Sequence, residues 1–264
     1  MSNILVIDIG NTRLKTGVFS NHELVKTNRI ILEDFEDELS HFSSQRFDEV
    51  IISSVVSPQL LGKIKKYWNA PIVIDSDTTL PFENNYETPE TLGIDRLCNA
   101  MFGYMHSETD TAVVIDLGTC LKFDTISRTK GYLGGSISPG IQLRYKALNQ
   151  FTGKLPLLNY TEQIDLIGRT THSSMHSGVM NAIQAELDGF MKEYSNKFED
   201  LTFFVTGGDL EHFDLASKND IFADENLTLK GLYEISTLST SQSINGRLLG
   251  CIVSLSRSIF LRYS

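Results

Sequence analysis

The sequence predicts an α/β protein built from two related halves, and three observations carry that prediction. Two short apolar runs, residues 4–7 and 112–115, each end in an aspartate that is followed by an aliphatic residue and a glycine. The two aspartates, Asp8 and Asp116, are about 100 residues apart, which is the length of one small domain. Short apolar runs alternate with segments of helical periodicity between them. A design repeated at this distance indicates two halves of similar architecture.

The first half alternates strands and helices in a specific order. Short runs rich in β-branched residues predict buried strands, and apolar residues such as Phe35, Leu39 and Phe42 recur at helical spacing. This order, βββαβαβ, resembles a ribonuclease-H-like half of the kind found in actin-like ATPases and sugar kinases. The strands are expected at residues 4–8, 16–19, 24–27, 49–55 and 71–75, and the helices at residues 33–42 and 60–68.

The end of the first strand has the composition of a phosphate-binding turn. A buried carboxylate at Asp8 needs a cation or hydrogen-bond donors. Gly10 permits a tight turn and the close approach of a ligand. The backbone N–H groups around Asn11 and Thr12 can then point at phosphate oxygens, with Lys15 nearby. The alternative is an ordinary β-hairpin with Asn11 in its turn.

A polar loop, residues 76–92, separates the first half from a helix that begins near Asp95 and Arg96. A helix N-terminus favours anions, so these two residues are candidates for substrate binding. The alternative is an aspartate that caps the helix and an arginine on its solvated face.

The second half repeats the pattern from residue 111 onward. The repeated turn at residues 116–119 is expected to face the first one across a shared cleft and to hold a polyphosphate and its metal with it. A strand is expected at residues 119–126, a hairpin turn at 128–131 and a small-residue stretch at 134–140 that opens a helix. Thr171 is placed to cap a later helix. A strand at 202–206 ends in Gly207 and Gly208, which can lie against a nucleotide or form a simple strand exit.

Bulk properties exclude several classes of protein. The chain has 264 residues, 41% of them apolar, and a net charge of −10, which disfavours nucleic-acid binding. Anionic substrates must therefore be captured by local donors. Three cysteines without C-x-x-C spacing favour a reducing compartment. Asp8 interrupts the first apolar run, and no run approaches the ~20 residues of a membrane span, so a cytoplasmic protein without a signal peptide or membrane contact is expected.

Four motifs occur in one order along the chain, at residues 8–15, 93–96, 116–119 and 206–208. Together they resemble the type III pantothenate kinase family over about residues 3–236. The resemblance implies two ribonuclease-H-like domains of the acetate and sugar kinase/Hsp70/actin superfamily. It also implies the conversion of ATP and pantothenate to 4′-phosphopantothenate, the first step of coenzyme A biosynthesis. The implied cofactors are Mg²⁺ with ATP and a monovalent cation, K⁺ or NH4⁺, and the implied assembly is a homodimer.

The resemblance also assigns roles to individual residues. Asp95 matches the proposed general base, and Asp116 matches the aspartate that binds the monovalent cation. Residues matching the ATP site are Asp8, Ile9, Gly10, Asn11, Thr12, Arg13, Leu14, Lys15 and Thr119. Residues matching the pantothenate site are Tyr86, Gly93, Ile94, Asp95, Arg96 and Thr171.

The domain organisation that follows is a first half at residues 1–110, a second half at 111–239 and a C-terminal extension at 240–264. The chain departs from the family pattern at Cys120, where alanine or threonine is common, and at Lys122, where threonine is common. Lys122 places an additional positive charge near the site and is expected to alter nucleotide affinity.

Three alternatives share the predicted fold. The first is another small-molecule kinase of the superfamily, such as a sugar kinase. The second is a non-enzymatic actin-like or chaperone-like ATP-binding protein, although such proteins carry large inserted subdomains. The third is a regulatory accessory protein of the same fold. The presence of Asp8, Asp95 and Asp116 favours catalysis.

Overall fold

The computed structural model describes residues 2–10, 12–162, 164–215 and 221–244. Contacts divide the chain into two compact units. Of the described residues, the first unit contains those up to His106 together with Thr228–Ile244, and the second contains those from Ser107 to Leu227. The sequence analysis had assigned residues 228–239 to the second half, whereas their contacts group them with the first. Of the predicted extension, residues 245–264 lie outside the described residues.

The first unit contains a five-stranded sheet in the order β3-β2-β1-β4-β5. β1 pairs antiparallel with β2, β2 pairs antiparallel with β3, and β4 and β5 continue the sheet in parallel to β1. This arrangement confirms the ribonuclease-H-like order predicted from the sequence. The elements are β1 (Asn3–Ile9), β2 (Arg13–Ser20), β3 (Glu23–Ile31), α1 (Phe35–Ser43), β4 (Glu49–Ser54), α2 (Pro58–Lys65), β5 (Ile72–Ile74), α3 (Ile94–His106) and α6 (Leu227–Ile244).

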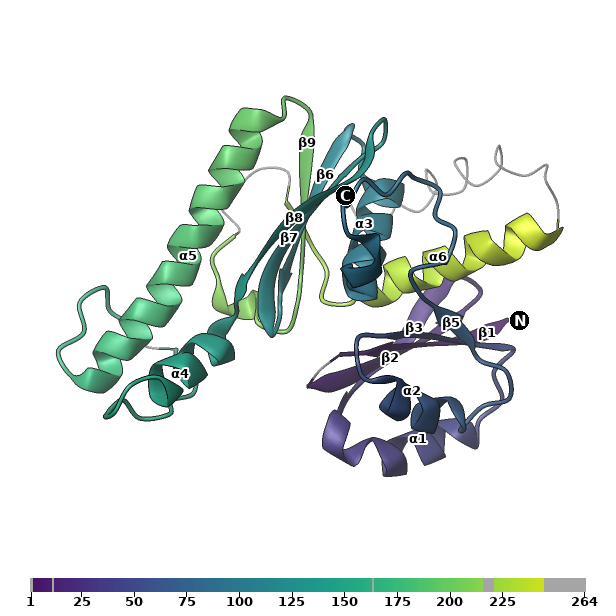
Figure 1. Cartoon of the computed structure of the whole chain (residues 1–264), viewed down its shortest axis with the longest axis horizontal. Helices are drawn as coiled ribbons and strands as arrows, with labels where there is room; N and C mark the ends of the chain where they lie inside the picture. The colour runs from purple at the N-terminus through teal and green to yellow at the C-terminus, as the bar shows by residue number, and fades with distance from the viewer. Residues whose placement is uncertain (1, 11, 163, 216–220, 245–264) are drawn as a thin grey trace. The chain divides into compact units, whose positions relative to one another are not determined.

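The two faces of this sheet are covered differently. Leu5, Ile7 and Ile9 of β1 are fully buried on the face that packs against α1 and α2 (Figure 1). Asp8 alternates with them and therefore lies on the opposite face. On that face the ring of Tyr233 from α6 stacks on Phe19 with 4.1 Å between centroids.

Helices α3 and α6 pack backbone to backbone within the first unit. A Cβ added at Gly231 of α6 would lie 1.9 Å from the carbonyl oxygen of Cys98 in α3. The hydroxyl of Thr228 donates a hydrogen bond to Asn99 Oδ1 at 2.8 Å, and both side chains are buried. These contacts explain why α6 groups with the first unit although it follows the second in sequence.

The second unit repeats the topology of the first. Its sheet has the order β10-β9-β6-β7-β8, so β6 has the place of β1 and β7 the place of β2. In the part of the chain that the structure describes, no helix is long and apolar enough to cross a membrane. The elements are β6 (Thr111–Leu117), β7 (Cys120–Ser127), β8 (Gly131–Pro139), α4 (Ile141–Gln150), α5 (Thr171–Lys197), β9 (Leu201–Thr206) and β10 (Ile221–Ala223).

One local prediction in this unit is confirmed in part and another was wrong. The small-residue stretch 134–140 does lead into a helix, since Gly140 is the N-cap of α4. Most of the stretch, however, is the second part of β8, in which Gly134 and Gly135 pair with Thr125 and Asp124 of β7. Glycines inside a strand are poor strand formers, so this strand gave no sequence signal. The cap of α5 is Thr170, whose Oγ1 accepts the Ser173 N–H at 3.1 Å.

Helices α4 and α5 cover one face of the second sheet (Figure 1). Val113, Ile115 and Leu117 of β6 are buried on that face. Asp116 alternates with them and lies on the other face, as Asp8 does in the first unit. The two units thus place equivalent aspartates on equivalent faces of their own sheets.

Candidate active site

Asp8 lies between two polar neighbours at the end of β1. It stands opposite Lys15 of β2 and Ser53 of β4 in the sheet register, so the three side chains share a face. The Ser53 hydroxyl donates a hydrogen bond to Asp8 Oδ1 at 2.8 Å. Asp8 is 9% exposed and Ser53 is fully buried. The sequence analysis missed Ser53, because its contact with Asp8 depends on the pairing of strands about 45 residues apart.

The connection from β1 to β2 is a hairpin turn, and Asn11 within it lies outside the described residues. The Gly10 N–H donates to the carbonyl oxygen of Arg13 at 3.0 Å. Thr12 and Arg13 are exposed at the turn, where they are accessible to a ligand. The side chains of Ile9 and Leu14 are fully buried in the core, so a role of these two in ATP binding is limited to their backbone.

The predicted acceptor motif lies at the N-terminus of α3. Asp95 Oδ1 accepts the backbone N–H of Arg96 at 3.0 Å. A Cβ at Gly93 would lie 2.4 Å from this oxygen, so only glycine leaves room for the carboxylate in this position. The positive end of the helix dipole stabilises negative charge here. Ile94 is buried and anchors the first turn of the helix.

Arg96 and Tyr86 form a second part of this motif. Arg96 is only 4% exposed, and its guanidinium carbon lies 5.4 Å from the centroid of the Tyr86 ring, in cation–π geometry. The backbone N–H of Tyr86 donates to Asn84 Oδ1 at 3.1 Å and thereby fixes the loop that carries the ring. The structure therefore brings Tyr86, predicted from a loop, to the helix that carries Asp95 and Arg96.

Helix α3, which carries Asp95, packs against β4, which carries Ser53, the hydrogen-bond partner of Asp8. The buried thiol of Cys98 on α3 lies near both carboxylates. Burial is the largest cause that raises the pKa of Cys98 well above its ordinary value, and the carboxylates of Asp8 and Asp95 raise this pKa further. Both carboxylates are thus within electrostatic reach of one thiol on α3. No sequence motif singled out Cys98, although it follows Asp95 by three residues on a helix and so shares its face.

The second aspartate has a different partner. Lys122 of β7 stands opposite Asp116 of β6 in the antiparallel register. Its ammonium nitrogen Nζ lies 2.7 Å from Asp116 Oδ2. The exposed fractions of the two side chains are 12% for Lys122 and 13% for Asp116. The pair is therefore largely shielded from solvent.

The turn after Asp116 is packed tightly by backbone on both sides. A Cβ at Gly140 would lie 2.2 Å from the carbonyl oxygen of Gly118, and one at Gly207 would lie 2.2 Å from that of Leu117. Gly207 also has φ +112°, a conformation that favours glycine. Within the second unit, Gly207 is thus a strand exit that supports the turn. Thr119 is exposed at its tip.

Thr171 is the first residue of α5 and is exposed. It belongs to the second unit, whereas Tyr86, Asp95 and Arg96 belong to the first. Its assignment to the pantothenate site stays a prediction.

The residues of the two turns differ in how well they fit metal ions. Among the described residues there is no group of three or more histidine, cysteine, aspartate or glutamate side chains that could hold a metal ion. A Mg²⁺ ion that accompanies a nucleotide binds through one or two carboxylates, water and the phosphates of that nucleotide. Asp8 fits such a role. A monovalent cation at Asp116 fits poorly, because the Lys122 ammonium already contacts Oδ2.

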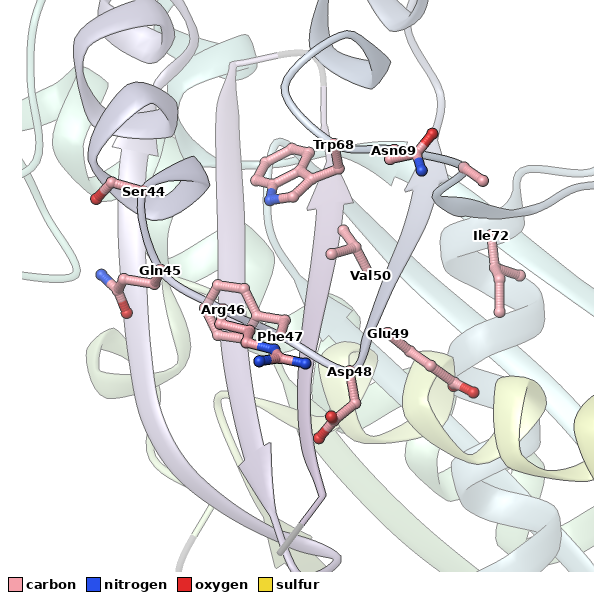
Figure 2. Close-up of a pocket in the computed structure, with 11 residues that line it drawn as sticks. Ser44, Gln45, Arg46, Phe47, Asp48, Glu49, Val50, Trp68, Asn69 and Ile72 are labelled. Carbon is pink, nitrogen blue, oxygen red and sulfur yellow. The ribbon is translucent and has the colours of Figure 1, made fainter.

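A surface pocket of about 420 Å³ lies at the other end of the first sheet (Figure 2). Its lining includes Asp48 and Glu49 at the start of β4, and Trp68 and Ile72 near the start of β5. In open α/β sheets, ligands bind outside the carboxyl ends of the strands, where Asp8 and Ser53 lie. This pocket is therefore not the candidate active site.

Two units of the same ribonuclease-H-like topology, each with an aspartate and a glycine at the end of its first strand, define the fold class of the protein. The family model of type III pantothenate kinase matches residues 4–193. A type III pantothenate kinase from Christiangramia forsetii is 39% identical over 243 residues, 90% of this chain and 99% of the relative. One from Flavobacterium psychrophilum is 37% identical over 238 residues, 87% of this chain and 96% of the relative. The chain belongs to the type III pantothenate kinase family.

A solved structure from Campylobacter jejuni, assigned to the Baf family of transcriptional activators, has a similar fold. Its TM-score is 0.59 at 22% identity, covering 90% of this chain and 99% of that one. At this identity the likeness shows the fold alone. Membership in a kinase family implies the use of ATP and a divalent metal ion.

Proposed function

We propose that this protein transfers the γ-phosphoryl group of ATP to pantothenate and forms 4′-phosphopantothenate, the first step of coenzyme A biosynthesis. The observation that carries the proposal is the arrangement in the first unit. There α3, which carries Asp95, packs against β4, which carries Ser53, the hydrogen-bond partner of Asp8. A kinase needs these two functions side by side, because phosphoryl transfer is mostly positioning and charge neutralisation.

ATP is held by the first turn, residues 8–15, and contacts Thr119 of the second. The exposed Thr12 and Arg13 and the half-buried Lys15 supply donors and positive charge to the phosphates. Asp8 acts through Mg²⁺ or its water ligands, because a bare carboxylate facing phosphate would repel it. Mg²⁺ neutralises phosphate charge when bound. Ser53 fixes the direction of the Asp8 carboxylate through its hydrogen bond.

Asp95 accepts the proton of the pantothenate hydroxyl. In a loose transition state this proton leaves late, so a positioned carboxylate suffices. The hydrogen bond from the Arg96 N–H to Oδ1 holds this carboxylate in position at the start of α3. The glycine at position 93 is part of this function because it makes room for the carboxylate.

Pantothenate is bound by the groups around α3, with Thr171 as a further contact. The Arg96 guanidinium offers a fork of donors that matches a carboxylate, and the α3 N-terminus favours an anion. Tyr86 holds the guanidinium by its ring. A homodimer and a cytoplasmic location are parts of the proposal that rest on the family resemblance and on composition.

The test is a coupled assay of ADP release by the purified protein with ATP and Mg²⁺, in the presence and absence of pantothenate. We expect ADP release that depends on pantothenate, and a product whose mass exceeds that of pantothenate by one phosphoryl group. Hexose sugars replace pantothenate in parallel reactions as the control. Release with a sugar alone would identify another kinase of the superfamily, and no release with either would favour a regulatory protein.

A further inference from the structure

The ion pair between Asp116 and Lys122 is built into the second sheet. Their backbones are direct partners in the antiparallel register of β6 and β7, and Nζ lies 2.7 Å from Oδ2. Each side chain is nearly nine-tenths buried. The lysine is held by a central strand, since β7 lies between β6 and β8. The ammonium group is therefore positioned by regular structure and not by a flexible loop.

The same aspartate directs its other oxygen to the second turn. A Cβ at Gly118 would lie 3.2 Å from Asp116 Oδ1, so this oxygen lies against the backbone of the turn. Thr119, the predicted ATP contact, is the next residue. One carboxylate, that of Asp116, therefore contacts both the Lys122 ammonium and the backbone of the turn that is proposed to bind the nucleotide.

We propose that the ammonium group of Lys122 replaces the monovalent cation at Asp116, so that phosphoryl transfer by this protein needs neither K⁺ nor NH4⁺. The inference rests on the proposed function, since the charge matters only where a nucleotide binds. An alkylammonium has the charge of K⁺ and the hydrogen-bonding group of NH4⁺. A free cation at Oδ2 would add a second positive charge within a few ångströms of Nζ, and like charges at that separation repel strongly.

Removing the positive charge of Lys122 should open a site for a free monovalent cation at Asp116. Lys122→Met preserves an unbranched apolar stem and leaves the Asp116 carboxylate without its ammonium partner. Thr206 of β9 stands opposite Asp116 on the other side, and among the described residues its buried Oγ1 has no hydrogen-bond partner. A carboxylate and a hydroxyl oxygen are ligands that suit K⁺, so the variant should bind the cation that the wild-type protein excludes.

The first measurement is the rate of pantothenate-dependent ADP release in K⁺, NH4⁺ or tetramethylammonium chloride at equal ionic strength. We expect equal wild-type rates in the three salts. Lys122→Met should lose roughly 10²–10³-fold in kcat/KM in tetramethylammonium, the scale of one lost electrostatic contact. K⁺ or NH4⁺ should restore most of that loss. Lys154→Met, which removes an exposed lysine of the same unit, is the control and should behave as wild type.

The second measurement is the thermal unfolding midpoint in the same salts, which requires no catalysis. A cation that binds the folded state raises the midpoint. We expect K⁺ to raise the midpoint of Lys122→Met above its value in tetramethylammonium and to leave the wild-type midpoint unchanged. The double variant Asp116→Asn/Lys122→Met has no charge at either position and should not respond to K⁺.

The outcomes separate the inference from the proposed function. Wild-type activity that requires K⁺ or NH4⁺ would overturn the inference and leave the kinase intact. A Lys122→Met midpoint that K⁺ does not raise would also overturn it. If no salt supports pantothenate phosphorylation by the wild-type protein, the proposed function fails, while the unfolding midpoints still decide whether Lys122 excludes the cation. If Lys122→Met does not fold, the wild-type rates in the three salts decide.

Discussion

The two units have the same strand order but hold their Asp-Gly turns in different ways. In the first unit, among the residues that the structure describes, a Cβ at Gly10 would meet the Arg13 carbonyl oxygen of the same hairpin, at 3.0 Å. In the second unit the turn is held from outside by Gly140 and Gly207. The second turn is therefore preorganised by its neighbours.

The equivalent aspartates also differ in their partners. Ser53 of β4 and Thr206 of β9 have equivalent positions, each opposite the aspartate of its own unit. The Ser53 hydroxyl donates to Asp8, whereas Asp116 is paired with Lys122. Lys15 stands opposite Asp8 as Lys122 stands opposite Asp116, so a lysine faces the aspartate in the register of both units. The repeat has thus preserved the scaffold and the lysine, while the hydrogen bond from Ser53 distinguishes Asp8.

The largest effect is expected for the acceptor chemistry, which we assign to the first unit alone. Asp95→Asn should lower kcat by roughly 10²–10⁴-fold, the usual contribution of a general base. ATP affinity should remain near the wild-type value, because Asp95 contacts the acceptor. Thr119→Val in the second unit should instead raise the KM for ATP. The measurements are steady-state kinetics for both variants and calorimetric titration with ADP.

A kcat for Asp95→Asn within a few-fold of the wild-type value would remove the base assignment. A loss of ADP affinity in the same variant would show that Asp95 also takes part in nucleotide binding, contrary to the proposal.

The next effect concerns the stability of the second turn. Gly207→Ala introduces a Cβ 2.2 Å from the Leu117 carbonyl oxygen at φ +112°. We expect a loss of about 2–4 kcal/mol in the free energy of unfolding, from strain and overpacking together. Gly10→Ala in the first turn should cost about 1 kcal/mol, since its contact is longer and its φ is not positive.

Denaturant unfolding followed by circular dichroism measures both losses. Trp68, the one tryptophan of the chain, reports on the first unit by fluorescence. Equal costs for the two substitutions would contradict the difference in packing between the turns.

The parts of the fold that the sequence predicted are those with a local signal. The apolar runs at residues 4–7 and 112–115 predicted β1 and β6, because a strand buried on both faces is continuously apolar. β8 gave no such signal, since its glycines and serines are typical of turns. The membership of α6 in the first unit depends on the contact between Gly231 and Cys98, which no local pattern reveals.

The residues of the candidate site also fall into those with a local sequence signal and those without one. Asp8, Asp95 and Asp116 stood out because each follows or opens a regular element at a glycine. Lys122 stood out as a departure from the family pattern, but its partner became known only with the register of β6 and β7. The contact of Ser53 with Asp8 requires the parallel pairing of β1 and β4. Sequence patterns therefore gave the residues, and strand pairing gave their partners.

A smaller effect tests the partners of the two aspartates directly. Ser53→Ala removes a buried hydrogen bond to a carboxylate and should cost about 1.5–3 kcal/mol in the free energy of unfolding. Thr206→Val is the matched substitution in the second unit. Its hydroxyl is buried and has no hydrogen-bond partner among the described residues, so its removal should be neutral or stabilising. Denaturant unfolding of the two variants decides, and a larger loss for Thr206→Val would reverse the comparison.

The smallest effect concerns the alkaline pH at which each of the two units unfolds. Each unit has a tyrosine hydroxyl that is hydrogen-bonded to a histidine. The Tyr145 hydroxyl lies 2.8 Å from His176 Nδ1, and the Tyr233 hydroxyl lies 2.7 Å from His22 Nδ1. Burial, and then the neighbouring Tyr160, raises the pKa of Tyr145 to about 12. Burial also raises the pKa of Tyr233, and the neighbouring Glu49 and Glu234 raise it further.

A folded pKa above the unfolded value means that the folded state holds the tyrosine proton more tightly. The resulting stabilisation is complete below the unfolded pKa of about 10 and is lost as the pH rises through the folded value near 12. Tyr145→Phe has no proton to lose, so its unfolding free energy should fall less steeply than the wild-type value above pH ~10. Tyr233→Phe should change the slope less. Because Tyr145 lies in the second unit, Trp68 fluorescence should report alkaline unfolding at a higher pH than circular dichroism does. The reverse order would mean that the first unit, and not the second, unfolds at the lower alkaline pH.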